Sequence, residues 1–253
     1  MSLKENFDKN PDGKDGQTPR KRAYVFDLDC TFFDTRPLYP AMRENAARLL
    51  MKHTTMNVAD ALDTVDRVLA ENNGYVREGF AREFGIHPHE TVDTVYDPAY
   101  MELTSVKFPP GFRDLIKSLD GPVYIYTNAS TPYADKLLAT NGFLSVVEDV
   151  YGVDRLDYHR KPSDGSFRAF EEATGLDDTY EIVFFEDSLE NLYHAKQRGW
   201  TTVLVNGYSQ GNMHANADMA TWDYVDRMVC DIAEFFDPDI KPKWTIPHDY
   251  IYR

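Results

Sequence analysis

The sequence has few cysteines and a deficit of positive charge. Its 253 residues include two cysteines, Cys30 and Cys230, which are too few for a disulfide framework. Lysine and arginine total 27 against 42 aspartates and glutamates, so the formal net charge is -15. Because a surface of this sign repels nucleic-acid backbones and anionic membranes, we expect neither a nucleic-acid polymer nor a membrane as a partner.

Long apolar runs are also missing. No stretch approaches the ~20 consecutive apolar residues that a membrane-spanning helix needs. The N-terminus lacks the apolar run of a signal peptide, so we expect a cytoplasmic protein. Hydrophobic residues still make up 42% of the chain, which is enough to bury a sizeable core.

Short apolar runs alternate along the chain with segments of helical spacing. This alternation predicts βαβ units and a doubly wound, Rossmann-like α/β fold with a parallel sheet. Strong strands are predicted at residues 23–26, 123–126, 182–185 and 202–205, and weaker ones near 146–151 and 224–229. Helices are predicted at about 132–139, at 166–174 and up to Gln197.

A long helical segment separates the first strong strand from the second. Apolar residues recur there at three- and four-residue steps, and Asn57 followed by Asp60 predicts a helix start. The polar residues at the N-terminus, with their Asn-Pro and Asp-Gly pairs, predict a disordered leader. The predicted organisation is a leader at 1–20, an α/β core at 21–35 and 109–235, a helical insert at 36–108 and a C-terminal tail at 236–253.

Polar side chains follow three of the strong strands at their carboxyl ends, where ligands bind in open parallel sheets. Because these ends meet at one edge of a sheet, we expect the side chains to converge. The first strand is followed by Asp27 and Asp29, the second by Thr127 and Asn128, and the third by Glu186 and Asp187, with Lys161 in a preceding loop.

This set of side chains suits phosphoryl transfer. Carboxylates from different strands repel one another, and a hard divalent cation such as magnesium relieves the repulsion. One carboxylate can attack phosphorus and form an aspartyl-phosphate, while a second protonates the leaving oxygen and later activates water. The hydroxyl, the amide and the lysine can hold the phosphoryl oxygens. By contrast, His87 and His89 flank Pro88 in what we expect to be a surface loop, not a zinc site.

Each of these features alone has a commoner structural explanation. An Asp-x-Asp pair is usually a turn or a cap. Thr127 and Asn128 can cap a helix, and Glu186 with Asp187 can favour the dipole of the next helix. Lys161 can be a solvated loop residue. The combination of all of them in one order is what favours catalysis.

The same residues resemble the four signatures of the haloacid-dehalogenase superfamily. The DLDCT segment at 27–31 is similar to the first signature, Thr127 to the second, Lys161-Pro162 to the third, and the EDS segment at 186–188 to the fourth. The resemblance covers about residues 23–205 and implies that the insert is a helical cap. Two departures are Cys30, where relatives commonly carry glycine, and a Glu-Asp pair in place of Asp-Asp.

The resemblance implies a magnesium-dependent phosphomonoester hydrolase that acts through an aspartyl-phosphate. Dehalogenases of the superfamily lack the second aspartate of the first signature, so Asp29 favours phosphate chemistry. The implied roles are nucleophile and metal ligand for Asp27, general acid and base with a metal-bound carbonyl for Asp29, metal ligation for Asp187 and Glu186, and phosphoryl binding for Thr127, Asn128 and Lys161.

Several segments resemble, more narrowly, the pyrimidine 5′-nucleotidase branch. They include NGY at 73–75, EGF at 78–80, FGI at 84–86, YTNA at 126–129 and FEDSLENL at 185–192. This resemblance implies a small phosphorylated metabolite as partner, namely a pyrimidine nucleoside 5′-monophosphate. The amide of Asn73 could pair with a base edge and the ring of Tyr75 could stack on the base, while Arg77 could meet a substrate anion or be a solvated arginine. A sugar-phosphate phosphatase, a phosphomutase and a noncatalytic regulatory protein with the same fold are the alternatives. The sequence leaves the oligomeric state open.

Overall fold

The computed structural model describes residues 20–72, 74–208 and 223–236. Nearly all of the predicted leader at 1–20 and of the predicted tail at 236–253 lies outside these residues, as does Asn73. Within the described ranges, no helix combines the length and the apolar character that crossing a membrane requires.

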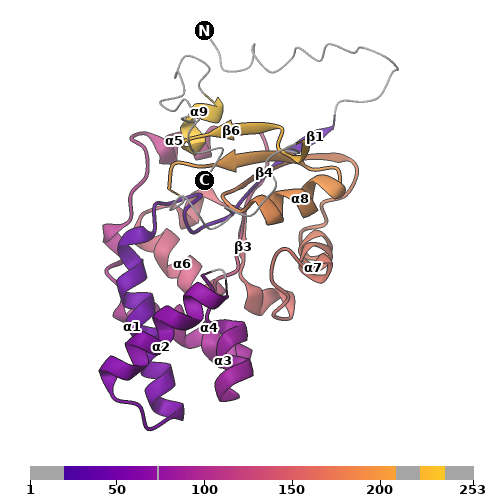
Figure 1. Cartoon of the computed structure of the whole chain (residues 1–253). Helices are drawn as coiled ribbons and strands as arrows, with labels where there is room; N and C mark the ends of the chain where they lie inside the picture. The colour runs from indigo at the N-terminus through magenta and orange to yellow at the C-terminus, as the bar shows by residue number, and fades with distance from the viewer. Residues whose placement is uncertain (1–19, 73, 209–222, 237–253) are drawn as a thin grey trace, which may run out of the picture.

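Six parallel strands form one sheet in the described part of the chain (Figure 1). They are β1 (Lys21–Phe26), β2 (Val123–Tyr126), β3 (Asp149–Tyr151), β4 (Tyr180–Glu186), β5 (Thr201–Val205) and β6 (Arg227–Val229). Their order across the sheet is β3-β2-β1-β4-β5-β6, and each neighbouring pair is parallel. The chain therefore winds outward from β1 on one side and then on the other, which confirms the predicted doubly wound α/β fold. Strands β3 and β6 are shorter than the sequence predicted.

The central strand β1 is buried on both faces. Its alternate residues point to opposite sides, so that Tyr24 and Phe26 join one apolar cluster while Ala23 and Val25 join another. This double burial explains why the strand reads as a continuous apolar run. The first face is covered by α5 (Phe112–Lys117), α6 (Thr131–Thr140) and α9 (Ile232–Phe236), and the second by α7 (Asp164–Thr174) and α8 (Leu189–Gln197).

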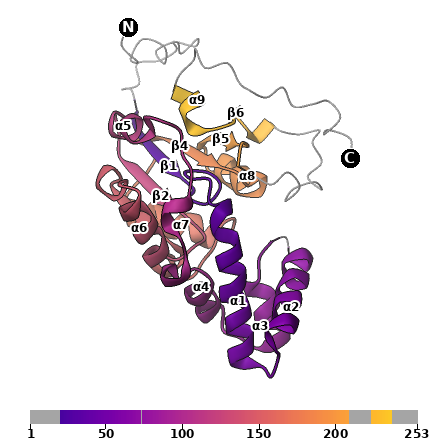
Figure 2. The same ribbon diagram turned by 90° about the vertical axis from the view of Figure 1, so that its left-hand side faces the viewer.

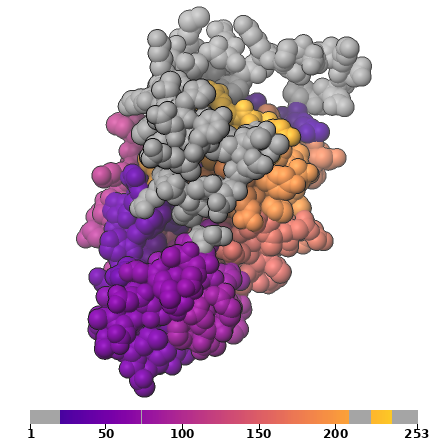
Figure 3. All heavy atoms as spheres, viewed as in Figure 1, coloured from indigo at the N-terminus to yellow at the C-terminus, as the bar shows by residue number. Residues whose placement is uncertain are grey.

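The helical insert between β1 and β2 has an apolar core of its own. Its main helices are α1 (Tyr39–His53), α2 (Val58–Glu71), α3 (Arg77–Phe84) and α4 (Pro88–Val95). Leu50, Val65 and Phe80 are fully buried among them in a cluster separate from those of the sheet. Figure 2 shows these helices beyond one end of the sheet, and Figure 3 shows them as a distinct lobe. The predicted inserted helical cap is thus confirmed, whereas the domain boundaries at residues 36 and 108 stay a prediction.

The segment around Pro88 corrects one sequence prediction. Pro88 is the first residue of α4, and the side chain of His87 caps the helix by accepting a hydrogen bond from the backbone N–H of His89. Proline suits this position because its φ is already helical and its missing N–H has no partner in the first turn. Both histidines are exposed, as expected, but the predicted loop was wrong.

We predict that Asn57→Ala destabilises the protein by about 1 kcal/mol. The Asn57 side chain accepts a hydrogen bond of 3.0 Å from the backbone N–H of Asp60 and so caps α2, as the sequence indicated. Urea titration of the wild type and of the variant measures the difference. Asn57→Ser keeps a capping oxygen and should lose only a few tenths of a kcal/mol. Equal losses in the two variants would contradict the capping role.

Candidate active site

Three carboxylates converge where β1 and β4 end. Asp27 directly follows β1, Glu186 is the last residue of β4, and Asp187 comes next. Because Phe26 pairs with Phe185 in the parallel register, the residues that follow are brought to one edge of the sheet. One carboxylate oxygen from each residue lies within 4.8 Å of the others. The structure therefore brings together these three predicted metal ligands.

Lys161 lies between two of these carboxylates. Its side chain is fully buried, and its Nζ lies 2.8 Å from Asp27 Oδ1 and 2.8 Å from Glu186 Oε2. The same ammonium donates a third hydrogen bond, of 2.7 Å, to the carbonyl of Tyr126. With three protein acceptors for its three protons, Lys161 fixes the position of Asp27 relative to β2 and β4.

The carboxylate of Glu186 is held from several sides. Its Oε1 accepts the backbone N–H groups of Asp187 and Ser188 at 3.1 Å, and its Oε2 accepts the Asn191 amide at 3.0 Å as well as Lys161. Burial opposes its ionisation, but the charge of Lys161 and these donors outweigh burial and hold the pKa of Glu186 below its ordinary value. Glu186 is thus a fixed negative charge in the site.

The other two carboxylates are disfavoured as anions when no cation lies between them. Burial, followed by the charge of Glu186, raises the pKa of Asp27 from 3.8 to about 8, with Lys161 opposing the rise. Burial, with the charges of Glu186 and Asp27, raises the pKa of Asp187 well above its ordinary value. The lysine therefore does not offset the negative charge of the cluster, and a divalent cation would.

Asp29 lies beside this cluster and is bound by a tyrosine. The Tyr133 hydroxyl donates a hydrogen bond of 2.7 Å to Asp29 Oδ1. Burial raises the pKa of Asp29, while the hydrogen bonds from Tyr133 and Thr35 act in the opposite direction. A raised pKa favours the protonated form of Asp29, which is the form that a general acid needs. The predicted metal contact of the Asp29 carbonyl stays a prediction.

Thr127 and Asn128 follow β2 and face the same edge, but their side chains have different partners. The Thr127 hydroxyl oxygen accepts the backbone N–H of Ala129 at 3.0 Å, which leaves its proton available to donate. The side-chain oxygen of Asn128 accepts a hydrogen bond of 2.7 Å from the backbone N–H of Lys161, and its amide nitrogen donates one of 3.1 Å to the backbone carbonyl of Lys161. Asn128 therefore clamps the backbone that carries the lysine, a contact that the sequence did not indicate.

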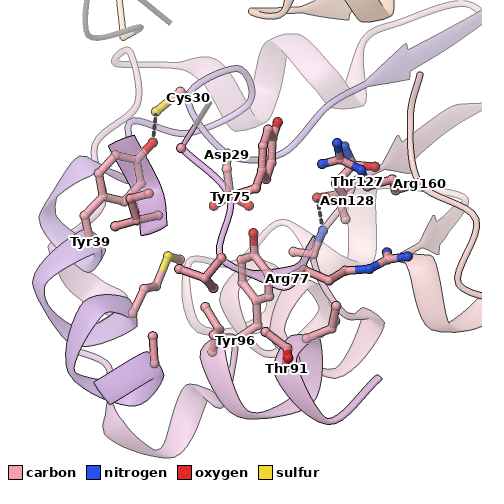
Figure 4. A pocket seen from close by; sticks show the side chains of 18 of the residues that line it. Asp29, Cys30, Tyr39, Tyr75, Arg77, Thr91, Tyr96, Thr127, Asn128 and Arg160 are labelled. Atoms are coloured by element: carbon pink, nitrogen blue, oxygen red, sulfur yellow. Dashed lines mark hydrogen bonds between the residues drawn. The ribbon is translucent and has the colours of Figure 1, made fainter. Parts of the chain in front are cut away.

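A cavity of about 740 Å³ lies between these strand ends and the cap helices. Asp27, Asp29 and Asp187 line it from the core. Tyr75, Arg77 and Tyr96 line it from the insert, and Figure 4 shows these three side chains together with Asp29. The predicted substrate residues Tyr75 and Arg77 thus lie on the same cavity as the predicted catalytic residues.

Sequence reasoning missed Arg160, which lies at the boundary between core and cap. Its guanidinium lies 4.4 Å from the centre of the Tyr75 ring and 3.2 Å from a carboxylate oxygen of Glu78. Arg77 donates to the carbonyl of Tyr158 at 3.3 Å, so both arginines join the cap to the loop before Lys161. The position of Arg160 next to Lys161 was a signal that could have marked it.

The backbone at Cys30 is of a kind that suits the glycine of the superfamily pattern better than a cysteine. Its φ is 60°, in the left-handed region that favours glycine, so a glycine at this position would relieve strain. The Cys30 Sγ lies 2.8 Å from the Tyr39 hydroxyl, and burial raises the pKa of the thiol to about 12. A thiol in this state is a poor nucleophile.

We predict that the metal-free protein loses stability as the pH rises. The folded-state pKa of Asp27 is raised from 3.8 to about 8. The stability that protonated Asp27 contributes is therefore fully present below pH 3.8 and is lost as the pH rises to about 8. In thermal unfolding with chelator present, the Tm of the wild type should fall relative to the Tm of Asp27→Asn as the pH rises across this window. Magnesium should restore the wild type chiefly at the upper end. If the Tm of the two proteins changed with pH in the same way, the raised pKa of Asp27 would be contradicted.

Comparison with known proteins gives the family. The haloacid dehalogenase-like hydrolase family matches residues 21–199. No curated protein matches the sequence.

Three similar solved structures, all below 25% identity, show the fold. HAD phosphatase from Thermococcus onnurineus is 19% identical with a TM-score of 0.57, covering 85% of this chain and 95% of that one. CbbY from Rhodobacter sphaeroides, in complex with phosphate, is 18% identical with a TM-score of 0.59 and coverages of 85% and 96%. The HAD-hydrolase YfnB from Bacillus subtilis, bound to magnesium, is 17% identical with a TM-score of 0.54 and coverages of 86% and 97%. Because the family match spans more than half of its length, the chain belongs to the haloacid dehalogenase-like hydrolases.

Proposed function

We propose that the protein is a magnesium-dependent phosphomonoester hydrolase that forms an aspartyl-phosphate on Asp27. The observation that carries the proposal is the position of Asp27, which lines the cavity, belongs to the carboxylate cluster and is held by Lys161 at 2.8 Å. Asp29 lines the same cavity two residues away and can serve as acid and base. Membership of the hydrolase family supports this chemistry, and two of the similar structures were described as a phosphatase and as a phosphate complex.

The donor set fits magnesium. The cluster offers only hard oxygen ligands, and its charge exceeds what Lys161 offsets. Asp27, Glu186 and Asp187 would hold the ion, together with the carbonyl of Asp29. When bound, magnesium neutralises charge on the phosphoryl oxygens and polarises the phosphorus centre. The solved structure of YfnB, a protein of similar fold, was bound to magnesium.

The side chains of this protein divide the reaction into two steps. In the first, a carboxylate oxygen of Asp27 attacks phosphorus, the bond from phosphorus to the leaving oxygen breaks, and Asp29 gives its proton to that oxygen. In the second, Asp29 takes a proton from water, which attacks the aspartyl-phosphate and releases phosphate from Asp27. Lys161 keeps Asp27 oriented through both steps, and the Thr127 hydroxyl donates to a phosphoryl oxygen.

The cap defines the substrate class in this proposal. We assign residues 21–35 and 109–235 to the catalytic core and residues 36–108 to the cap, which covers the leaving group and excludes water. A cavity of about 740 Å³ between them suits a small phosphorylated metabolite. We also propose a cytoplasmic location, which the small number of cysteines supports.

We further propose pyrimidine nucleoside 5′-monophosphates as substrates. The rings of Tyr75 and Tyr96 line the same cavity as Asp29, and a base could stack on them there (Figure 4). One face of Tyr75 packs against Arg160, so a base would use the other face. The sequence resemblance to the pyrimidine 5′-nucleotidase branch points to the same substrates. A sugar phosphate is the competing substrate, and return of the phosphoryl group to a sugar would indicate a phosphomutase.

We predict that the wild type hydrolyses p-nitrophenyl phosphate with magnesium, and that Asp27→Asn lowers kcat on the order of a thousandfold. Mass spectrometry after acid quench should find a phosphoryl group on Asp27. Chelator should abolish turnover reversibly, and calcium should replace magnesium poorly because its coordination is larger and looser. Asp114→Asn, on α5 and exposed, is the matched control and should keep wild-type turnover. Turnover by Asp27→Asn at the wild-type rate would rule out the mechanism, and inactive wild type would favour a noncatalytic role.

We predict that uridine and cytidine 5′-monophosphates are hydrolysed in preference to adenosine and guanosine 5′-monophosphates. Tyr75→Ala should raise KM for the preferred nucleotides while sparing p-nitrophenyl phosphate. Tyr100→Ala is a matched control, since the Tyr100 ring also packs against an arginine, at 4.1 Å from Arg48, but does not line the cavity. The measurement is the rate of phosphate release from a panel of nucleoside monophosphates and sugar phosphates. Brisk turnover of sugar phosphates without any nucleotide hydrolysis would reject the nucleotide assignment and leave the phosphatase assignment intact.

A further inference from the structure

Tyr133 is a buried residue in contact with the proposed acid and base. It lies on α6 in the apolar cluster of the core, and its side chain is fully buried. Its hydroxyl donates to Asp29 Oδ1 at 2.7 Å. The apolar cluster offers no reason for a hydroxyl group at this place, because a phenylalanine ring would pack as well.

We propose that Tyr133 is a positioning residue, whose hydroxyl holds the Asp29 carboxyl group in the orientation from which it protonates the leaving oxygen. The proposal rests on the proposed function. It assigns no proton transfer to Tyr133 itself, which acts only through Asp29.

The hydrogen bond leaves the second oxygen of Asp29 for the carboxyl proton in this proposal. Oδ1 accepts the hydroxyl proton of Tyr133, and we assign the carboxyl proton that is to be transferred to Oδ2. In the first step this proton passes from Oδ2 to the leaving oxygen as the bond between phosphorus and that oxygen breaks. Without the Tyr133 hydroxyl, the hydrogen bond from Thr35 is left to restrain rotation of the carboxyl group about its Cβ–Cγ bond, so the proton is less often directed at the leaving oxygen.

The position of Tyr133 also links this orientation to the cap. The centre of its ring lies 5.3 Å from that of Tyr96, the residue that follows α4 and lines the cavity. The ring is therefore packed between the apolar core on one side and a cap residue on the other. With its ring restrained in this way, the hydroxyl of Tyr133 is a fixed donor for Asp29.

Esters with graded leaving groups separate positioning from a merely structural role. Proton donation matters most when the leaving phenol is weakly acidic and least when it is strongly acidic. We expect Tyr133→Phe to lower kcat/KM about tenfold for phenyl phosphate and less than about twofold for p-nitrophenyl phosphate. Across a series of para-substituted phenyl phosphates with magnesium, the dependence of kcat/KM on leaving-group pKa should become steeper.

Tyr24→Phe is the matched control for this experiment. Tyr24 is also buried, and its hydroxyl donates to an aspartate, Asp120, at 2.8 Å, but neither residue lines the cavity. Tyr24→Phe should keep the wild-type slope, and thermal unfolding should show both variants folded. In an Asp29→Asn background, Tyr133→Phe should change the slope no further.

Three results would overturn the proposal. They are an equal loss of kcat/KM across the whole ester series in Tyr133→Phe, the same steepening in Tyr24→Phe, and a further steepening in the Asp29→Asn background. Failure of the proposed function is a distinguishable result, because the wild type itself would then hydrolyse none of the esters. That result would remove the reaction that gives Tyr133 its role.

Discussion

The ammonium of Lys161 between Asp27 and Glu186 is the interaction on which the site depends. An isolated buried charge is costly, so neither the lysine nor the two carboxylates could occupy this position without the others. Asn128 fixes the backbone of Lys161 through two hydrogen bonds, and the carbonyl of Tyr126 accepts the third hydrogen bond of the Lys161 ammonium. The arrangement therefore joins the ends of β1, β2 and β4 through one side chain. The parallel register of β1 with β2 and with β4 brings these strand ends together.

The same lysine connects the core to the cap through the short segment that precedes it. Asp157 and Tyr158 both have positive φ values, of 51° and 58°, which are strained for residues other than glycine. Arg77 of the cap donates to the Tyr158 carbonyl, and the ring of His89 stacks on that of Tyr158. Residues of the cap therefore contact a segment with unfavourable backbone conformation, three residues before Lys161.

The sequence predicts the position of residues that follow a strand, because the strand itself is recognised from its local apolar pattern. Asp27 and Asp187 follow apolar runs, and the ends of parallel strands share one edge, so their convergence could be predicted. The clamp formed by Asn128 could not, since an amide after a strand serves a phosphate or a backbone equally well. Tyr133 was out of reach for a different reason. Whether the hydroxyl of a buried helical tyrosine reaches Asp29 depends on how α6 rotates against the sheet, which a single sequence does not encode locally.

The overall charge of -15 raises the question of how an anionic ester enters the cavity. Asp27, Asp29, Glu186 and Asp187 line the cavity, and Lys161 donates its three hydrogen bonds to two of them and to the carbonyl of Tyr126. On the proposed mechanism, a phosphate would meet repulsion there until a divalent cation reversed the local field. Arg77 and Arg160 line the cavity as well, and the single carboxylate of Glu78 next to both offsets only part of their positive charge. Attraction of the substrate thus depends on a few local cations rather than on the net charge, and binding of the metal before the substrate is the order that these charges favour.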